Sequence, residues 1–189
     1  MKVEDTAIPE VKILTPARFA DERGFLSESW NRARLAEAGI DIDFVQDNHS
    51  FSLRKGTVRG LHFQAPPHAQ AKLVRCGRGA LWDVAVDIRR GSPSYGHWVA
   101  TELSFENGRQ LLIPEGFAHG FVTLCDEVEV LYKCSDYYAP NCALELQFDD
   151  AGIGIDWGIT RAEAVLSDKD AAAPPLCDLD SPFVWEGAP

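Results

Sequence analysis

The run from residue 81 to residue 88 reads Leu81-Trp82-Asp83-Val84-Ala85-Val86-Asp87-Ile88, and it decides the fold class. Four large apolar side chains recur at every second position, and two aspartates stand on the opposite face. Side chains of an extended strand point alternately to its two sides, so this period of two predicts a half-buried antiparallel strand. We expect the aspartates to face solvent.

Strand-like runs of the same kind fill most of the chain, separated by turn signals such as Arg90–Pro93 and Glu106–Gly108. They are predicted at 58–64, 72–76, 98–105, 109–113, 120–124 and 128–133. Helical signal is limited to Asn31–Ala38 and Ser167–Ala173, each with a capping side chain at its start. Many short strands with few helices predict an all-β sandwich or jelly-roll barrel.

The length of 189 residues predicts one domain, with an N-terminal arm at about 1–45 and a C-terminal segment at about 155–189 packing around a central barrel. With 29 acidic against 18 basic residues, the net charge of -11 argues against a nucleic-acid or acidic-membrane binder. A small anionic ligand needs only a local basic cluster.

No window is apolar enough for a membrane span, and the N-terminus lacks the apolar core of a signal peptide. The five cysteines are odd in number and widely spaced, which favours reduced thiols over a disulfide framework. We therefore expect a cytoplasmic protein.

Arg59 and His62 lie in the otherwise apolar strand VRGLHFQ, residues 58–64, where a charged group is costly unless it is paired or used. Simple alternation places the two side chains on opposite faces. Gly60, between them, permits a bulge that would turn both into one cavity.

Several motifs, taken together in order and spacing, strongly resemble the dTDP-4-dehydrorhamnose 3,5-epimerase family of cupin-fold enzymes. They are FADERGFLSE (19–28), QDNHS (46–50), RGLHFQ (59–64), KLVR (72–75), VAVDIR (84–89), GSPSYG (91–96), IPEGFAHGF (113–121), Tyr132-Lys133 and LSDKDAAAP (166–174). The resemblance implies a cupin-type jelly-roll β-barrel and a homodimer that exchanges an N-terminal strand.

The resemblance also implies four catalytic residues for a substrate whose 4-keto group acidifies the hydrogens at C3 and C5. His62 would be the base, Asp170 would orient its imidazole, Lys72 would stabilise the enolate oxygen, and Tyr132 would protonate the opposite face. Alternation places Tyr132 on the same strand face as Val128 and Val130. Taken alone, each of the four could equally be an ordinary core or surface residue.

Binding residues follow from the resemblance in the same way. Arg59, Arg23, His119 and Lys169 would hold the nucleotide diphosphate, and Glu28, Gln46 and Asn48 the sugar and base. Tyr138 would stack on the nucleobase, although its neighbour Tyr137 is an alternative.

Metal-binding cupins carry the motifs G-x5-H-x-H-x3,4-E and P-x-G-x2-H. The second is present as Pro114, Gly116 and His119, but His62-Phe63-Gln64 replaces the H-x-H of the first. Because an amide is a poor substitute for an imidazole, we expect no metal and no other cofactor.

The sequence departs from the family at Ala143, where a glutamate is common, at Phe148, which replaces a tryptophan, and at Gly158, which replaces a proline. We predict an isomerase that inverts C3 and C5 of dTDP-4-dehydro-6-deoxy-D-glucose. A 3-only or 5-only epimerase of a related sugar is the alternative. More remote are a metal-dependent cupin oxygenase and a non-catalytic nucleotide-sugar-binding cupin.

Overall fold

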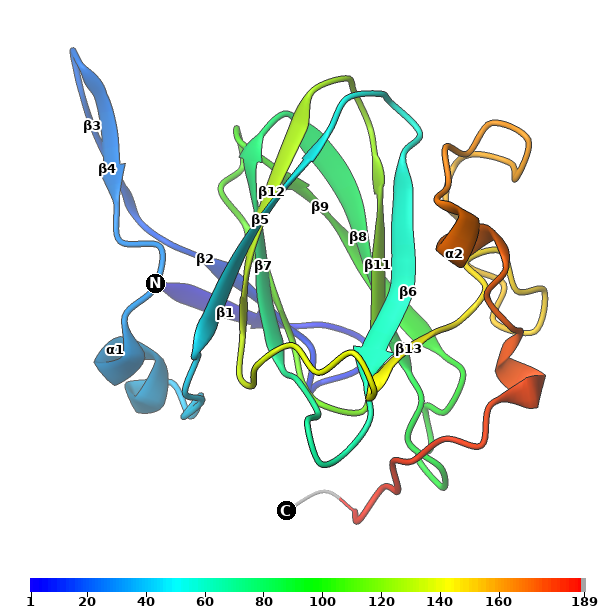
Figure 1. The fold of residues 1–189 in the computed structure, drawn as a ribbon. Coiled ribbons are helices and arrows are strands. Elements are labelled where there is room, and N and C mark those ends of the chain that lie inside the picture. The colour runs from blue at the N-terminus through cyan, green and yellow to red at the C-terminus, as the bar shows by residue number, and fades with distance from the viewer. Residues whose placement is uncertain (188–189) are drawn as a thin grey trace.

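A computed structural model of the chain describes residues 1–187. Two antiparallel sheets face each other and form a β-barrel, with two short α-helices outside it (Figure 1). The strands are β1 (Lys2–Asp5), β2 (Lys12–Thr15), β3 (Arg18–Asp21), β4 (Gly24–Ser27), β5 (Gln46–Ser52), β6 (Val58–Gln64), β7 (Lys72–Arg78), β8 (Ala80–Asp87), β9 (Trp98–Ser104), β10 (Gln110–Ile113), β11 (Phe117–Thr123), β12 (Val128–Cys134) and β13 (Ala143–Glu145).

One sheet has six strands in the order β1-β2-β10-β7-β12-β5, and the other has five in the order β13-β6-β11-β8-β9. Residues 1–45, expected as an arm, thus contribute β1 and β2 to an edge of the first sheet. Strands β3 and β4 pair only with each other and project from the barrel as a hairpin (Figure 1).

Both predicted helices form where their capping signals lie. Helix α1 (Arg32–Glu37) begins after Asn31, whose side chain accepts from the Arg34 amide, and α2 (Asp168–Ala171) begins after Ser167, which caps the Asp170 amide. A 3-10 turn, η1 (Leu176–Asp178), follows α2. The C-terminal segment that carries α2 and η1 runs along the outside of the barrel, beside β6 (Figure 1). Residues 188–189, included in the predicted C-terminal segment, lie outside the described part.

The prediction that the side chains of β8 alternate between two faces is confirmed, but the prediction that its aspartates are exposed is wrong. Asp83 and Asp87 are fully buried. The face that carries Val84 and Val86 points outward and is covered by the C-terminal segment, while Ala85 packs inside the barrel. Both faces of the strand are therefore buried, because a barrel interior lies on one side and a covering segment on the other.

The aspartates are buried with partners, as buried charges must be. Asp87 accepts hydrogen bonds from the Arg89 amide and guanidinium and from the hydroxyls of Ser92 and Ser94. Burial alone would raise the pKa of Asp87, but these bonds outweigh burial and lower it. Arg89 also reaches Glu10, at 2.9 Å, and so ties the N-terminal residues to the barrel.

Within residues 1–187, none of the helices has the length and apolar character that crossing a membrane would require.

Candidate active site

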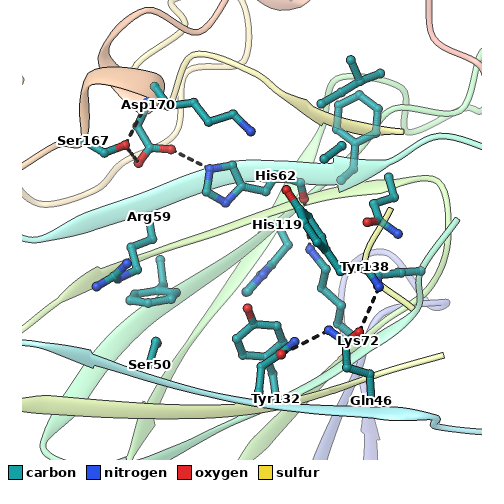
Figure 2. Close-up of a pocket in the computed structure, with 18 residues that line it drawn as sticks. Gln46, Ser50, Arg59, His62, Lys72, His119, Tyr132, Tyr138, Ser167 and Asp170 are labelled. Atoms are coloured by element: carbon teal, nitrogen blue, oxygen red, sulfur yellow. Dashed lines mark hydrogen bonds and ion pairs between the residues drawn. The ribbon is translucent and has the colours of Figure 1, made fainter. Parts of the chain in front are cut away.

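A pocket of about 350 Å³ opens between the two sheets, next to α2. Most of the predicted site residues, although far apart in the sequence, line this one pocket (Figure 2). They are Gln46, Asn48, Arg59, His62, Lys72, His119, Tyr132, Tyr138, Lys169 and Asp170. Tyr137, the alternative to Tyr138, is not among the lining residues.

The predicted bulge in β6 is confirmed. His62 pairs with His119 of β11, whereas Arg59 pairs with Phe121, so three steps on β6 match two on β11. Gly60 sits in the bulge with φ +130°, and a Cβ there would lie 2.4 Å from the Cα of Gly120. Only glycine fits this approach, and the extra residue turns Arg59 and His62 into the same pocket.

His62 forms a close pair with Asp170, which α2 supplies. Its Nε2 lies 2.6 Å from Asp170 Oδ1, and the Ser167 hydroxyl donates to Oδ2, also over 2.6 Å (Figure 2). The Asp170 side chain is only 6 % exposed. Burial would raise the pKa of Asp170, but the hydrogen bonds from His62 and Ser167 prevail and lower it, so the carboxylate stays ionised.

Lys72 and Tyr132 face the pocket from the opposite sheet. Lys72 is almost fully buried and donates from Nζ to the His62 carbonyl, 3.2 Å away. Burial lowers the pKa of the Lys72 ammonium and raises the pKa of the Tyr132 phenol. Tyr132 packs with Val128 and Val130 against the barrel core, as the alternation predicts.

A second histidine–aspartate pair lies deeper in the barrel. His119 Nε2 is 2.8 Å from Oδ1 of Asp83, whose other oxygen, Oδ2, is buried and has no hydrogen-bond partner among residues 1–187. Burial lowers the pKa of His119, although Asp83 acts in the opposite direction. Sequence reasoning missed Asp83 because it assigned that strand face to solvent.

The basic side chains toward the pocket mouth are held by the protein itself. Arg59 donates to the Ser52 hydroxyl at 3.2 Å and to the Phe51 carbonyl at 3.1 Å. Lys169 forms an ion pair with Glu145, 2.8 Å away, and Gln46 donates to Asn48 over 3.1 Å.

Arg23 and Glu28 do not line the pocket of their own chain. Arg23 lies at the turn of the β3–β4 hairpin and pairs with Asp21, and Glu28 pairs with Arg34 of α1 at 3.0 Å. The structure therefore separates these two predicted binding residues from the other ten.

The three departures from the family pattern have different surroundings. Ala143 lines the pocket and pairs in register with Gln64, whereas Glu145, two residues on, is engaged by Lys169. Phe148 is buried against Trp157, whose indole donates to the Phe148 carbonyl, and Gly158 has φ +66° with open space around it. Only Ala143 therefore changes the pocket wall.

Three further polar side chains, those of Ser50, Gln70 and Ser167, line the pocket without having been singled out from the sequence as site residues. Ser50 faces it from β5 with a buried hydroxyl for which the described residues provide no hydrogen-bond partner. Ser167 was expected only as a helix cap, yet its hydroxyl also binds Asp170. Its place three residues before Asp170 was the available signal.

In the described part of the chain, no three histidine, cysteine or acidic side chains gather as metal ligands would. Gln64, which stands at the second histidine of the metal-cupin motif, directs its amide at main-chain groups of two loops.

Comparisons with known protein families and structures agree with the site described above. A family model described as dTDP-4-dehydrorhamnose 3,5-epimerase matches residues 5–178. The chain belongs to this family. The enzyme of that name from Salmonella typhimurium strain LT2 is 54% identical over 177 residues, which cover 93% of this chain and 96% of the relative.

Solved structures of the family have the same fold. The Legionella pneumophila Philadelphia 1 enzyme, in complex with dTDP-4-keto-L-rhamnose, superposes with a TM-score of 0.90 at 47% identity and covers 95% of this chain and 94% of its own. The Bacillus anthracis enzyme, with TDP and PPi bound, gives a TM-score of 0.89 at 44% identity and coverages of 92% and 98%. The predicted cupin-type fold, family and isomerase class are confirmed.

Proposed function

We propose that this epimerase-family chain inverts C3 and C5 of dTDP-4-dehydro-6-deoxy-D-glucose and yields dTDP-4-dehydro-L-rhamnose, without a metal. One observation carries the proposal. A histidine–aspartate pair, a buried lysine and a partly buried phenol line the same pocket from different sides. Such a set supplies a base, an oxyanion partner and an acid, which inversion next to a ketone requires.

His62 takes the proton from the carbon next to the ketone. Because Nε2 donates to Asp170, Nδ1 carries the lone pair that accepts this proton. The C–H electron pair moves into the ring and the charge develops on the C4 oxygen. Asp170, which remains ionised, balances the positive charge that His62 acquires.

Lys72 provides a positive charge for the developing enolate oxygen, and its own side chain is almost fully buried. Tyr132 then gives its phenolic proton to the opposite face of the same carbon. His62 releases the proton it took to solvent, and solvent returns a proton to Tyr132, so both groups are reset. Burial raises the pKa of Tyr132, so the phenol is protonated at neutral pH and ready to donate. Repeating the cycle at the second carbon completes the reaction.

The nucleotide occupies the mouth of the pocket. Arg59 and Lys169 bind the diphosphate with His119, Gln46 and Asn48 hold the sugar and base, and Tyr138 stacks on the base. Lys169 leaves or shares its contact with Glu145 when the diphosphate arrives.

Arg23 and Glu28 complete the site in a homodimer that exchanges an N-terminal strand. The β3–β4 hairpin supports this arrangement, because Phe19 is 66% exposed and Leu26 is 75% exposed on an element that contacts little of its own barrel. Each chain, acting as one domain, thereby lends Arg23 to its neighbour's pocket. The chain has a mass of 20.9 kDa, and light scattering of the purified protein should give twice that value.

We expect the enzyme in the cytoplasm. All five cysteines are unpaired, which suits a reducing compartment.

A single-carbon epimerase is the second candidate. A 3'-monoepimerase from Streptomyces bikiniensis, solved with dTDP-quinovose, superposes with a TM-score of 0.85 at 33% identity. The shared fold therefore does not distinguish an enzyme that inverts one carbon from an enzyme that inverts two.

Proton NMR of the reaction in deuterated water tests the proposal. Deuterium should enter at both C3 and C5 of dTDP-4-keto-6-deoxyglucose. Incorporation at one carbon would support the second candidate, and none would contradict both. The His62→Asn variant should bind the nucleotide sugar without exchange, and normal turnover by that variant would end the proposed mechanism.

A further inference from the structure

Gln64 uses its side-chain amide to join two loops at the pocket wall. It is the last residue of β6 and only 4% exposed. Its Nε2 donates to the carbonyls of His68, at 2.7 Å, and Tyr137, at 3.2 Å, while its Oε1 accepts from the Ala139 amide at 2.8 Å. Both donors are used, and the orientation of the amide follows from its partners.

Two other glutamines hold the same loop, residues 135–142, which we name the Tyr138 loop. Gln46 Oε1 accepts from the Tyr138 amide at 2.9 Å, and Gln70 Nε2 donates to the Asp136 carbonyl at 2.7 Å. Main-chain groups of four consecutive residues, 136–139, are therefore bound by glutamine side chains. Hydrogen bonds from side chains to four successive main-chain positions restrict the loop.

The Tyr138 ring itself has little support. The residue is 60% exposed, although it lines the pocket, and Figure 2 shows its ring standing beside the cavity above Lys72 and Gln46. The residue is thus held at the pocket through its main chain rather than by packing around its ring. Of the glutamines that hold it, Gln64 makes the most bonds and is the only one that binds the loop on both sides of Tyr138.

We propose that Gln64 is a positioning residue for nucleotide recognition: its amide holds the main chain of Tyr137 and Ala139, and so keeps Tyr138 at the pocket, where its ring stacks on the base. The inference rests on the proposed function, since the ring matters only if a nucleobase enters there. A stacking surface held in place beforehand loses less conformational freedom when the base binds, so the loop's rigidity contributes to affinity.

The Gln64→Met variant tests this, because methionine fills a similar volume without hydrogen bonds. The Kd for TDP, measured by calorimetry, and the KM for the nucleotide sugar should each rise about tenfold, and KM should change more than kcat. Gln147→Met, which removes an amide bonded to Asp149 away from the pocket, should leave both unchanged. A fall in kcat with unaltered Kd and KM would contradict the proposal.

A double-mutant cycle separates positioning from general stability. If Gln64 acts through the ring, Gln64→Met should weaken TDP binding in the wild type but add nothing to Tyr138→Ala. An additive loss would show that Gln64 acts by another route and would overturn the inference.

Amide exchange provides a readout that needs no nucleotide. The Ala139 amide should exchange slowly in the wild type and at least tenfold faster in Gln64→Met, while the core strand β8 remains protected. Equal exchange rates in the two proteins would refute the positioning role. Failure of the wild type to bind TDP would instead count against the proposed function, and the exchange result would still decide whether Gln64 holds the loop.

Discussion

Replacing Asp170 with asparagine removes a single charge from the His62 pair and leaves the shape of the site nearly unchanged. When His62 accepts a proton, it becomes a cation whose Nε2 lies 2.6 Å from the Asp170 carboxylate. Two unit charges about 4 Å apart interact by about 4 kcal/mol at an effective dielectric constant of about 20. A neutral hydrogen bond from His62 to the asparagine would recover about 1 kcal/mol.

The net loss of about 3 kcal/mol appears only after proton transfer has begun, so it falls on kcat. We expect kcat of Asp170→Asn to drop about a hundredfold, since each 1.36 kcal/mol is a factor of ten in rate. The assay is deuterium incorporation at saturating nucleotide sugar. Asp168→Asn is the matched control, because Asp168 lies on the same helix, exposed, and its change removes the same charge.

The control should keep wild-type turnover, and urea titration should show that both variants fold. If kcat of Asp170→Asn stays within about threefold of wild type, the carboxylate does not stabilise the imidazolium. An equal loss in Asp168→Asn would mean that the net charge of the helix, and not the pair, is responsible.

Three further predictions concern other parts of the barrel. Asp87 has a pKa in the folded protein below that in the unfolded chain, so its contribution to stability is present above about pH 4 and is lost as the pH falls through the folded pKa. In urea titrations, Asp87→Asn should therefore reduce the free energy of unfolding by about 3 kcal/mol at pH 7 and by less at pH 3. A difference in stability that does not change with pH would be inconsistent with this linkage. Gly60→Ala should reduce the free energy of unfolding by more than about 2 kcal/mol and abolish turnover, because φ is +130° and Gly120 blocks the Cβ. The control Gly91→Ala, at a positive φ but with open space around the Cβ, should reduce it by about 1 kcal/mol. Equal losses of stability would show that the close approach of Gly60 to Gly120 is unimportant. Lys72→Met should lower kcat about a hundredfold or more in the deuterium assay. It should not lower the stability of the fold, since burial already disfavours the charged ammonium of Lys72. Full activity of this variant would remove Lys72 from the mechanism.

Local signals were sufficient wherever a residue's role depended on its immediate neighbours. Asn31 and Ser167 cap helices, and Gly60 permits the bulge that brings Arg59 and His62 together, as their positions predicted. These features depend on main-chain geometry within a few residues, which a short stretch of sequence specifies.

Burial depends instead on what the rest of the chain brings to each face. Alternation identified the two faces of β8 but gave no means of knowing that the C-terminal segment covers the apolar face and that the acidic face lines the barrel. Asp83 was therefore overlooked as the partner of His119. An acid inside a strand run was the available signal, because burying it requires a specific partner.

Other contacts were beyond the sequence because they join distant segments or separate chains. The resemblance grouped Arg23 with Arg59, yet the hairpin holds Arg23 outside the pocket of its own chain. Likewise, only the structure shows that Tyr138 lines the pocket whereas Tyr137 does not.

Burial shifts the pKa values of Lys72 and Tyr132 in opposite directions, and both shifts suit the proposed chemistry. Desolvation disfavours the charged forms of both Lys72 and Tyr132, so it lowers one pKa and raises the other. In the resting enzyme this keeps the phenol protonated and leaves the lysine's charge poorly solvated. In the proposed mechanism, an enolate that forms beside Lys72 supplies the missing counter-charge in a partly desolvated site. The interaction is therefore stronger with the intermediate than with the neutral ketone, which is the condition for lowering the barrier rather than merely tightening binding.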